Sequence, residues 1–190
     1  TAPWPADWQL DPDQRYFLTV SARTGIAAPL RESEVSSLRT LVATDLESVQ
    51  ATSAAIDALG LDPVTQNLLR AGRFREAGLA AQAIAAYEAA YIAQPTPEVA
   101  IALGDLYLDA ELQRFAFLAY QAALDLPATE ANPAKQAAAE FGIGLVYFNR
   151  GNYAEAEPHL ATAFELYQTV DAENERTDVE AALAATRERL

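Results

Sequence analysis

The 190-residue sequence contains no cysteine and no methionine, and it has one histidine and one lysine. Without cysteine the chain forms neither disulfides nor thiolate metal sites, and it suits a reducing or an oxidising compartment equally. No apolar run approaches the ~20 residues that a membrane-spanning helix requires, so we expect no membrane span. Because Thr1 is not a translation start, a removed signal segment or a trimmed sequence precedes it. Its Thr-Ala-Pro beginning favours an exported, periplasmic protein over a cytoplasmic one.

Basic residues are few, and the formal net charge is −14. A chain this acidic repels phosphate, so we expect neither nucleic acid nor anionic lipid as a partner. His159, the sole histidine, has no nucleophile or orienting group beside it in the sequence. The glycines at 142 and 144 lack the Lys-Ser/Thr that a phosphate-binding loop needs. The sequence therefore predicts no catalytic, cofactor or metal site.

A repeated pattern of small and aromatic residues runs from Ala71 to Leu166 at a spacing of about 34 residues. Its three copies contain Phe74, Gly78, Ala83, Tyr87, Ala90 and Pro95, then Leu103, Gly104, Tyr107, Ala116, Tyr120 and Ala123, then Ile143, Gly144, Tyr147, Gly151, Ala156, Leu160 and Ala163. A repeat of this length with two amphipathic helices is typical of a helical solenoid. Glycine within a helix costs ~1 kcal/mol relative to alanine. Gly104 and Gly144 therefore indicate places where another helix crosses too closely for a side chain.

Capping residues and prolines set the expected helix boundaries. The predicted repeat helices are 63–76, 79–93, 96–110, 112–126, 133–150 and 153–169, followed by a helix from about 173 to the C-terminus. Before them, Asp11 opens a predicted helix to Arg23, although the run from Tyr16 to Val20 has a strand-like composition. A further helix is predicted from Ser33 to Gly60. We expect the segment that carries Trp4 and Trp8 to pack on these N-terminal helices.

The pattern resembles the tetratricopeptide repeat (TPR) family over about residues 64–170. The resemblance implies an all-α, right-handed superhelix of three helix pairs (63–170), with an N-terminal helical cap (1–62) and a C-terminal capping helix (171–190). Four positions depart from the family pattern: Ala71 replaces the inter-helix glycine of the first repeat, and Glu111 replaces the turn glycine of the second. In the third repeat, Leu160 and Gln168 are off the pattern. Some members bind C-terminal carboxylates through a clamp of basic and asparagine residues. The corresponding positions here hold Leu68, Gly72, Ala102, Ala138 and Gly142, which cannot form that clamp.

The resemblance also implies a concave groove that is lined by the first helix of each pair. Its expected residues in this chain are Leu68, Arg75, Ile101, Asp105, Leu108, Asp109, Phe141, Leu145, Phe148 and Asn149. Such a groove is apolar with an acidic rim, which suits a peptide with aliphatic anchors and basic residues. Asp105 and Asp109 lie one helical turn apart, and two carboxylates are too few for a calcium cage.

The predicted function is a non-catalytic protein-interaction module, either a scaffold or an assembly factor. The excess of arginine over lysine and the abundance of alanine fit a GC-rich bacterial gene. Three alternatives stay open. The flanking helices of the same chain fill the groove, an enzyme or small-ligand site lies between the N-terminal region and the first repeat, or the chain is a structural solenoid that forms homo-oligomers.

Overall fold

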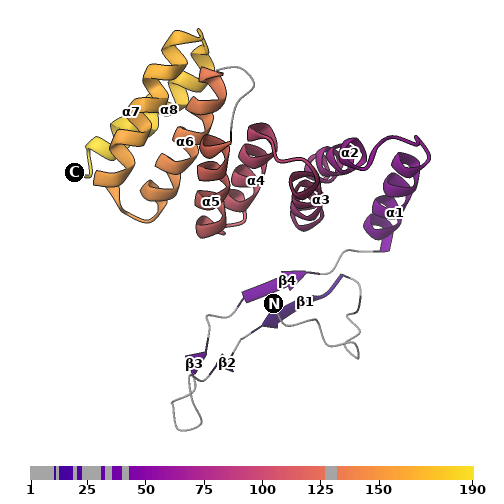
Figure 1. Ribbon diagram of the computed structural model, residues 1–190. Helices are drawn as coiled ribbons and strands as arrows, with labels where there is room; N and C mark the ends of the chain where they lie inside the picture. The colour runs from indigo at the N-terminus through magenta and orange to yellow at the C-terminus, as the bar shows by residue number, and fades with distance from the viewer. Residues whose placement is uncertain are drawn as a thin grey trace. The chain divides into compact units, whose positions relative to one another are not determined.

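The computed structural model describes residues 11, 13–18, 21–22, 31–32, 36–39, 43–126 and 132–190. The chain divides into two compact units, Thr1–Ala55 and Ile56–Leu190 (Figure 1). The second unit contains the repeats. None of the helices among the described residues combines the length and the hydropathy that crossing a bilayer demands.

The first unit contains short antiparallel strands. Strand β1 (Arg15–Leu18) pairs with β4 (Ser36–Arg39), and β2 (Ser21–Ala22) pairs with β3 (Arg31–Glu32). The helices predicted to begin at Asp11 and at Ser33 are therefore wrong at these strands, and helix α1 begins later and spans Ala43–Asp57. The physical reason is that pairing across the sequence satisfies backbone groups in a segment rich in aromatic and β-branched residues. The prediction for Trp4 and Trp8 lies outside the described residues.

Unit 2 contains helices that pack side by side as antiparallel hairpins (Figure 1). Their bounds are α2 (Pro63–Glu76), α3 (Ala80–Ala93), α4 (Pro97–Asp109), α5 (Gln113–Asp125), α6 (Pro133–Asn149), α7 (Tyr153–Thr169) and α8 (Glu173–Arg187). The predicted repeat helices agree with these bounds to within one residue at each end. The all-α solenoid is therefore confirmed. Helices α2–α3, α4–α5 and α6–α7 are its three hairpins, and α8 packs on α7.

The first helix of each hairpin begins with a side-chain cap followed by proline. Asp62 Oδ1 accepts hydrogen bonds from the backbone N–H groups of Val64 and Thr65 at 3.0 and 3.1 Å. Thr96 and Asn132 cap α4 and α6 in the same way. A proline at the first helical position forfeits only an N–H that has no partner in the helix. These three cap-proline pairs therefore fix where each hairpin starts.

Each hairpin turns through one residue with a positive φ. That residue is Gly78 (71°) in the first hairpin, Glu111 (59°) in the second and Gly151 (76°) in the third. In the second turn, the next backbone N–H, that of Leu112, donates to the carbonyl oxygen of Tyr107 at 2.7 Å, and the other two turns contain the equivalent bond. This bond is the helix-ending pattern that glycine favours. Glu111 therefore adopts a backbone conformation that is unfavourable for its residue type.

The aromatic ring of Tyr120 lies between two helical glycines from successive hairpins. A Cβ atom at Gly104 would lie 2.4 Å from the ring, and one at Gly142 would lie 2.3 Å from it. Similarly, a Cβ at Gly144 would lie 2.6 Å from Leu160. The close approach predicted for Gly104 and Gly144 is thus present, and a side chain of the following helix fills the space.

The first hairpin packs differently against the second. By repeat spacing, Ala71 and Ala102 correspond to Gly104 and Gly142, and Tyr87 corresponds to Tyr120. Two Cβ atoms therefore occupy the places that glycines leave open around Tyr120. Among the described helices, α4 and α6 have Cα atoms within 8 Å of each other, whereas α2 and α4 do not, and neither do α3 and α5.

Candidate functional site

The ten predicted groove residues lie on α2, α4 and α6, and we call this surface the first-helix face. Five of them are exposed: Leu68, Arg75, Asp105, Asp109 and Asn149. Five are half-buried: Ile101, Leu108, Phe141, Leu145 and Phe148. Ile101 and Leu108 pack against the core cluster that contains Tyr120.

Asp105 is the centre of the charged part of the first-helix face. Its Oδ1 accepts a hydrogen bond from the Tyr120 hydroxyl at 2.8 Å. Loss of solvent around the carboxyl group raises the pKa of Asp105, although part of the residue stays exposed. The hydrogen bond from Tyr120 opposes this rise, Asp109 adds to it and Arg75 again opposes it. Arg75 from the first hairpin and Asp105 and Asp109 from the second therefore form one electrostatic group.

The third hairpin's share of the face lies against the C-terminal helix. Phe141 packs on core clusters that include Val179 and Leu183 of α8, and Phe148 packs on the cluster of Leu183. The Arg189 guanidinium lies over the Phe148 ring, 5.2 Å from its centroid. Phe141 and Phe148 are therefore packed against other residues of the same chain. The part of the face that is available to a partner therefore centres on α2 and α4.

His159 links α6 to α7. Its Nδ1 lies 2.7 Å from Oε2 of Glu140, and its ring stacks on Tyr147 at a centroid distance of 5.6 Å. These contacts give the imidazole a structural role between two helices. In the part of the chain that the structure describes, no group of three or more His, Asp or Glu side chains is placed to hold a metal ion.

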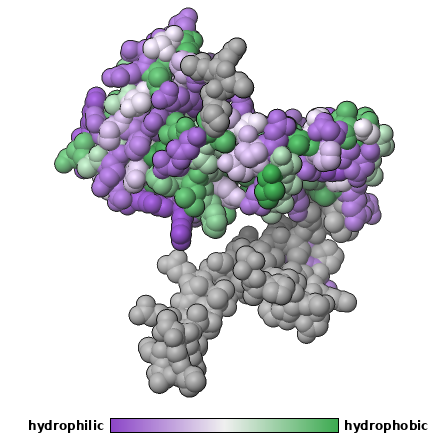
Figure 2. Space-filling view, viewed as in Figure 1, coloured by the Kyte–Doolittle hydropathy of each residue, from purple (hydrophilic) through white to green (hydrophobic). Residues whose placement is uncertain are grey.

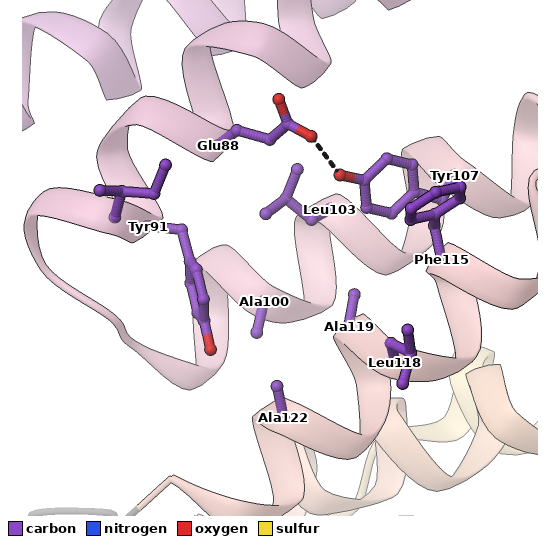
Figure 3. A pocket seen from close by; sticks show the side chains of 10 residues that line it. Glu88, Tyr91, Ala100, Leu103, Tyr107, Phe115, Leu118, Ala119 and Ala122 are labelled. Carbon is purple, nitrogen blue, oxygen red and sulfur yellow. Dashed lines mark hydrogen bonds between the residues drawn. The ribbon is translucent and has the colours of Figure 1, made fainter. Parts of the chain in front are cut away.

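A pocket that the sequence did not reveal lies on the second helices, between α3 and α5 and above α4 (Figure 3). We call it the α3–α5 pocket. Its volume is about 410 Å³, and it is lined by Glu88, Tyr91, Ile92, Ala100, Leu103, Tyr107, Phe115, Leu118, Ala119 and Ala122. Three large side chains in this set are exposed: Ile92 at 82%, Phe115 at 54% and Leu118 at 53%. Hydrophobic surface is visible over α5 and over α3 in Figure 2.

One polar interaction marks the α3–α5 pocket. The Tyr107 hydroxyl donates a hydrogen bond of 2.6 Å to Oε1 of Glu88, and the Tyr107 ring contacts Phe115 at a centroid distance of 5.6 Å. Burial and the Glu88 carboxylate raise the pKa of Tyr107, so the hydroxyl remains a donor. A sequence signal for this pocket exists in α3, whose fourteen residues include a single charged one, Glu88.

Comparisons with known proteins support the fold. No protein-family model matches the chain, and no curated protein sequence matches it. Two solved structures, both described as crystal structures of MamA, have similar folds. One superposes with a TM-score of 0.52 at 19% identity and covers 77% of this chain and 85% of the other. The second gives 0.51 and 20%, with coverages of 74% and 85%. At this level of identity the likeness establishes a TPR-like helical solenoid and leaves function to the surfaces of this chain.

Proposed function

We propose that the chain is a non-catalytic protein-interaction module that binds a peptide segment across the first-helix face of α2 and α4. The carrying observation is the pair of exposed carboxylates Asp105 and Asp109 on one side of α4, with Arg75 of the first hairpin acting electrostatically on Asp105. Half-buried Ile101 and Leu108 lie on the same helix as the two aspartates and supply apolar contact. The matching partner is a peptide with aliphatic anchors and at least one Lys or Arg.

Asp109 is the best position for a charge-reversal test. It is exposed, whereas Asp105 accepts the hydrogen bond from Tyr120, so a change at Asp105 alters packing as well as charge. Tagged full chain would be used to capture partners from an extract of the source cells, and the captured protein would then be purified and titrated. We expect Asp109→Lys to weaken this binding about tenfold or more, because it converts attraction into repulsion at the contact.

The matched control is Asp125→Lys, which makes the same charge change on α5, an exposed position outside the face. If both variants bind equally to the wild type, the first-helix face is not the binding surface. If both lose affinity equally, net charge and not this face governs the interaction. A chain that binds no partner and instead self-associates in sedimentation equilibrium favours the structural-solenoid alternative.

A further inference from the structure

We infer that the α3–α5 pocket is a second docking surface, which binds one amphipathic helix of a basic partner protein. This pocket shares no residue with the first-helix face. The inference therefore goes beyond the proposed function and is tested independently of it. The lining residues of the pocket come from three consecutive helices of the second unit.

The pocket lies between the second helices of the first two hairpins, over α4. Three α4 residues, Ala100, Leu103 and Tyr107, line it together with residues of α3 and α5. Small side chains then leave the space unfilled, since Ala100, Ala119 and Ala122 line it. In Figure 3, Tyr91 forms one side of this space and the α5 residues Leu118 and Ala122 form the other. The result is a hollow that receives protruding side chains.

The rim of the pocket is apolar where a rim of polar residues is usual. Ile92, Phe115 and Leu118 keep more than half of their surface exposed. Monomeric proteins rarely leave a continuous group of large apolar side chains around a hollow uncovered, and such groups mark interaction sites. A pocket together with its apolar rim therefore indicates an occupant that both inserts side chains and covers the surface around them.

The geometry favours a helix over the other kinds of occupant. Residues of two helices, α3 and α5, flank the pocket. A third helix with apolar residues at positions i, i+3 or i+4, and i+7 fits between two such helices. Sites for small molecules contain several convergent polar groups, whereas the described lining residues with polar side chains are Glu88 and two tyrosines, Tyr91 and Tyr107. The lining also offers no strand edge, so an added β-strand has no backbone partner in it.

Charge selects a basic partner over a second copy of this chain. Glu88 stands at one end of the pocket, and its carboxylate faces solvent beside its bond to Tyr107. Among the described residues that line the pocket, no side chain is cationic. Since each copy of the chain carries a formal charge of −14, two copies repel each other, whereas a helix with Lys or Arg beside its apolar face is attracted.

The test is a selection of displayed helix-forming peptides of about 18 residues on the immobilised full chain. The selected peptides are then synthesised and titrated against variants. We expect them to share the apolar spacing described above with flanking Lys or Arg. We expect them to bind about tenfold more weakly to Ile92→Glu and to Leu118→Asn, and several-fold more weakly to Glu88→Gln. Leu59→Glu is the matched control, because Leu59 is exposed at 60% and lies outside the pocket.

Three outcomes would overturn the inference. They are a selection that yields only acidic or extended sequences or none, peptide affinity that Ile92→Glu and Leu118→Asn leave unchanged, and a wild-type dimer that Ile92→Glu dissociates. Ile92 is nearly fully exposed, so its variant folds, and circular dichroism of both variants verifies this. Asp109→Lys separates the two surfaces, since it leaves peptide binding to the pocket unchanged whether or not the first-helix face binds a partner.

Discussion

The hydroxyl of Tyr120 donates a hydrogen bond of 2.8 Å to Oδ1 of Asp105, and so joins the second helix of the middle hairpin to the first. The same side chain is 1% exposed, and its ring contacts the backbone positions of Gly104 and Gly142. One residue thus connects the core to the charged first-helix face. Changes on either side of it have different and measurable effects.

Replacing Asp105 with asparagine is expected to stabilise the chain at neutral pH. The folded state raises the pKa of Asp105 above its ordinary value of 3.8, mainly through loss of solvent. Its stabilising contribution is therefore complete below that value and is lost as the pH rises through the raised pKa. The asparagine side chain would be neutral and would keep an oxygen for the Tyr120 hydroxyl. The urea midpoint of Asp105→Asn should exceed that of the wild type at pH 7, with a smaller difference near pH 4. Asp125→Asn controls for net charge, and a difference that does not depend on pH would contradict this account.

Adding a methyl group at Gly142 is expected to destabilise the fold by about 1–3 kcal/mol. Its Cβ would lie 2.3 Å from the Tyr120 ring, which is buried and hydrogen-bonded and so has little freedom to move. Gly104→Ala should behave in the same way. The control is Gly72→Ala on α2, where a Cβ meets no atom within 4 Å and alanine is the better helix former by up to ~1 kcal/mol. Chemical denaturation of the three variants tests the difference, and equal effects at Gly72 and Gly142 would refute the packing argument.

The turn between α4 and α5 should become more stable when Glu111 is replaced by glycine. At a φ of 59°, an L-residue with a side chain costs roughly 1–2 kcal/mol that glycine avoids. Part of this gain is offset by the greater freedom of glycine in the unfolded chain, so we expect about 1 kcal/mol. Thermal unfolding would measure it. Gly151→Ala makes the reverse change in the equivalent turn and should lower the melting temperature, so a fall in both variants would count against the explanation.

Backbone amides of the first hairpin should exchange hydrogen faster than those of the third. Stability in a solenoid is a sum of hairpin and interface terms, and among the described helices the first hairpin meets the second through α3 and α4 alone. The third hairpin has a partner on each side, since α6 contacts α4 and α5 while α7 contacts α8. Hydrogen exchange measured by mass spectrometry should therefore show opening of α2 and α3 first. Equal protection from exchange in α2 and α7 would mean that the smaller interface of the first hairpin does not lower its local stability.

The sequence predicted the helices of unit 2 well because their boundaries depend on local chemistry. Asp62, Thr96 and Asn132 cap helices through bonds that span two or three residues, and the next residue in each case is proline. The strands of the first unit depend instead on pairing such as that of Arg15 with Arg39. A local period cannot reveal a partner so distant along the chain.

The sequence assigned the residues of the first-helix face to the helices on which they lie, whereas it did not predict the α3–α5 pocket. The residue positions follow from the helical period, which places Asp105 and Asp109 on one side of α4. Whether a side chain is free depends on other helices, as the cation–π contact of Arg189 with Phe148 illustrates. The pocket depends on how α3, α4 and α5 pack together, which the helical period of a single sequence does not display.

In a repeat protein, one hairpin can be exchanged for another when their interfaces match. Here the packing of Tyr120 between Gly104 and Gly142 limits which hairpin can follow the second. The two sides of the ring face different hairpins, so the second hairpin packs best against a neighbour with glycine at the position of Gly142. The corresponding residue of the first hairpin is Leu69. A duplicated first hairpin in third place would bring a leucine against Tyr120. The order in which the second and third hairpins follow each other along the chain therefore depends on one aromatic ring.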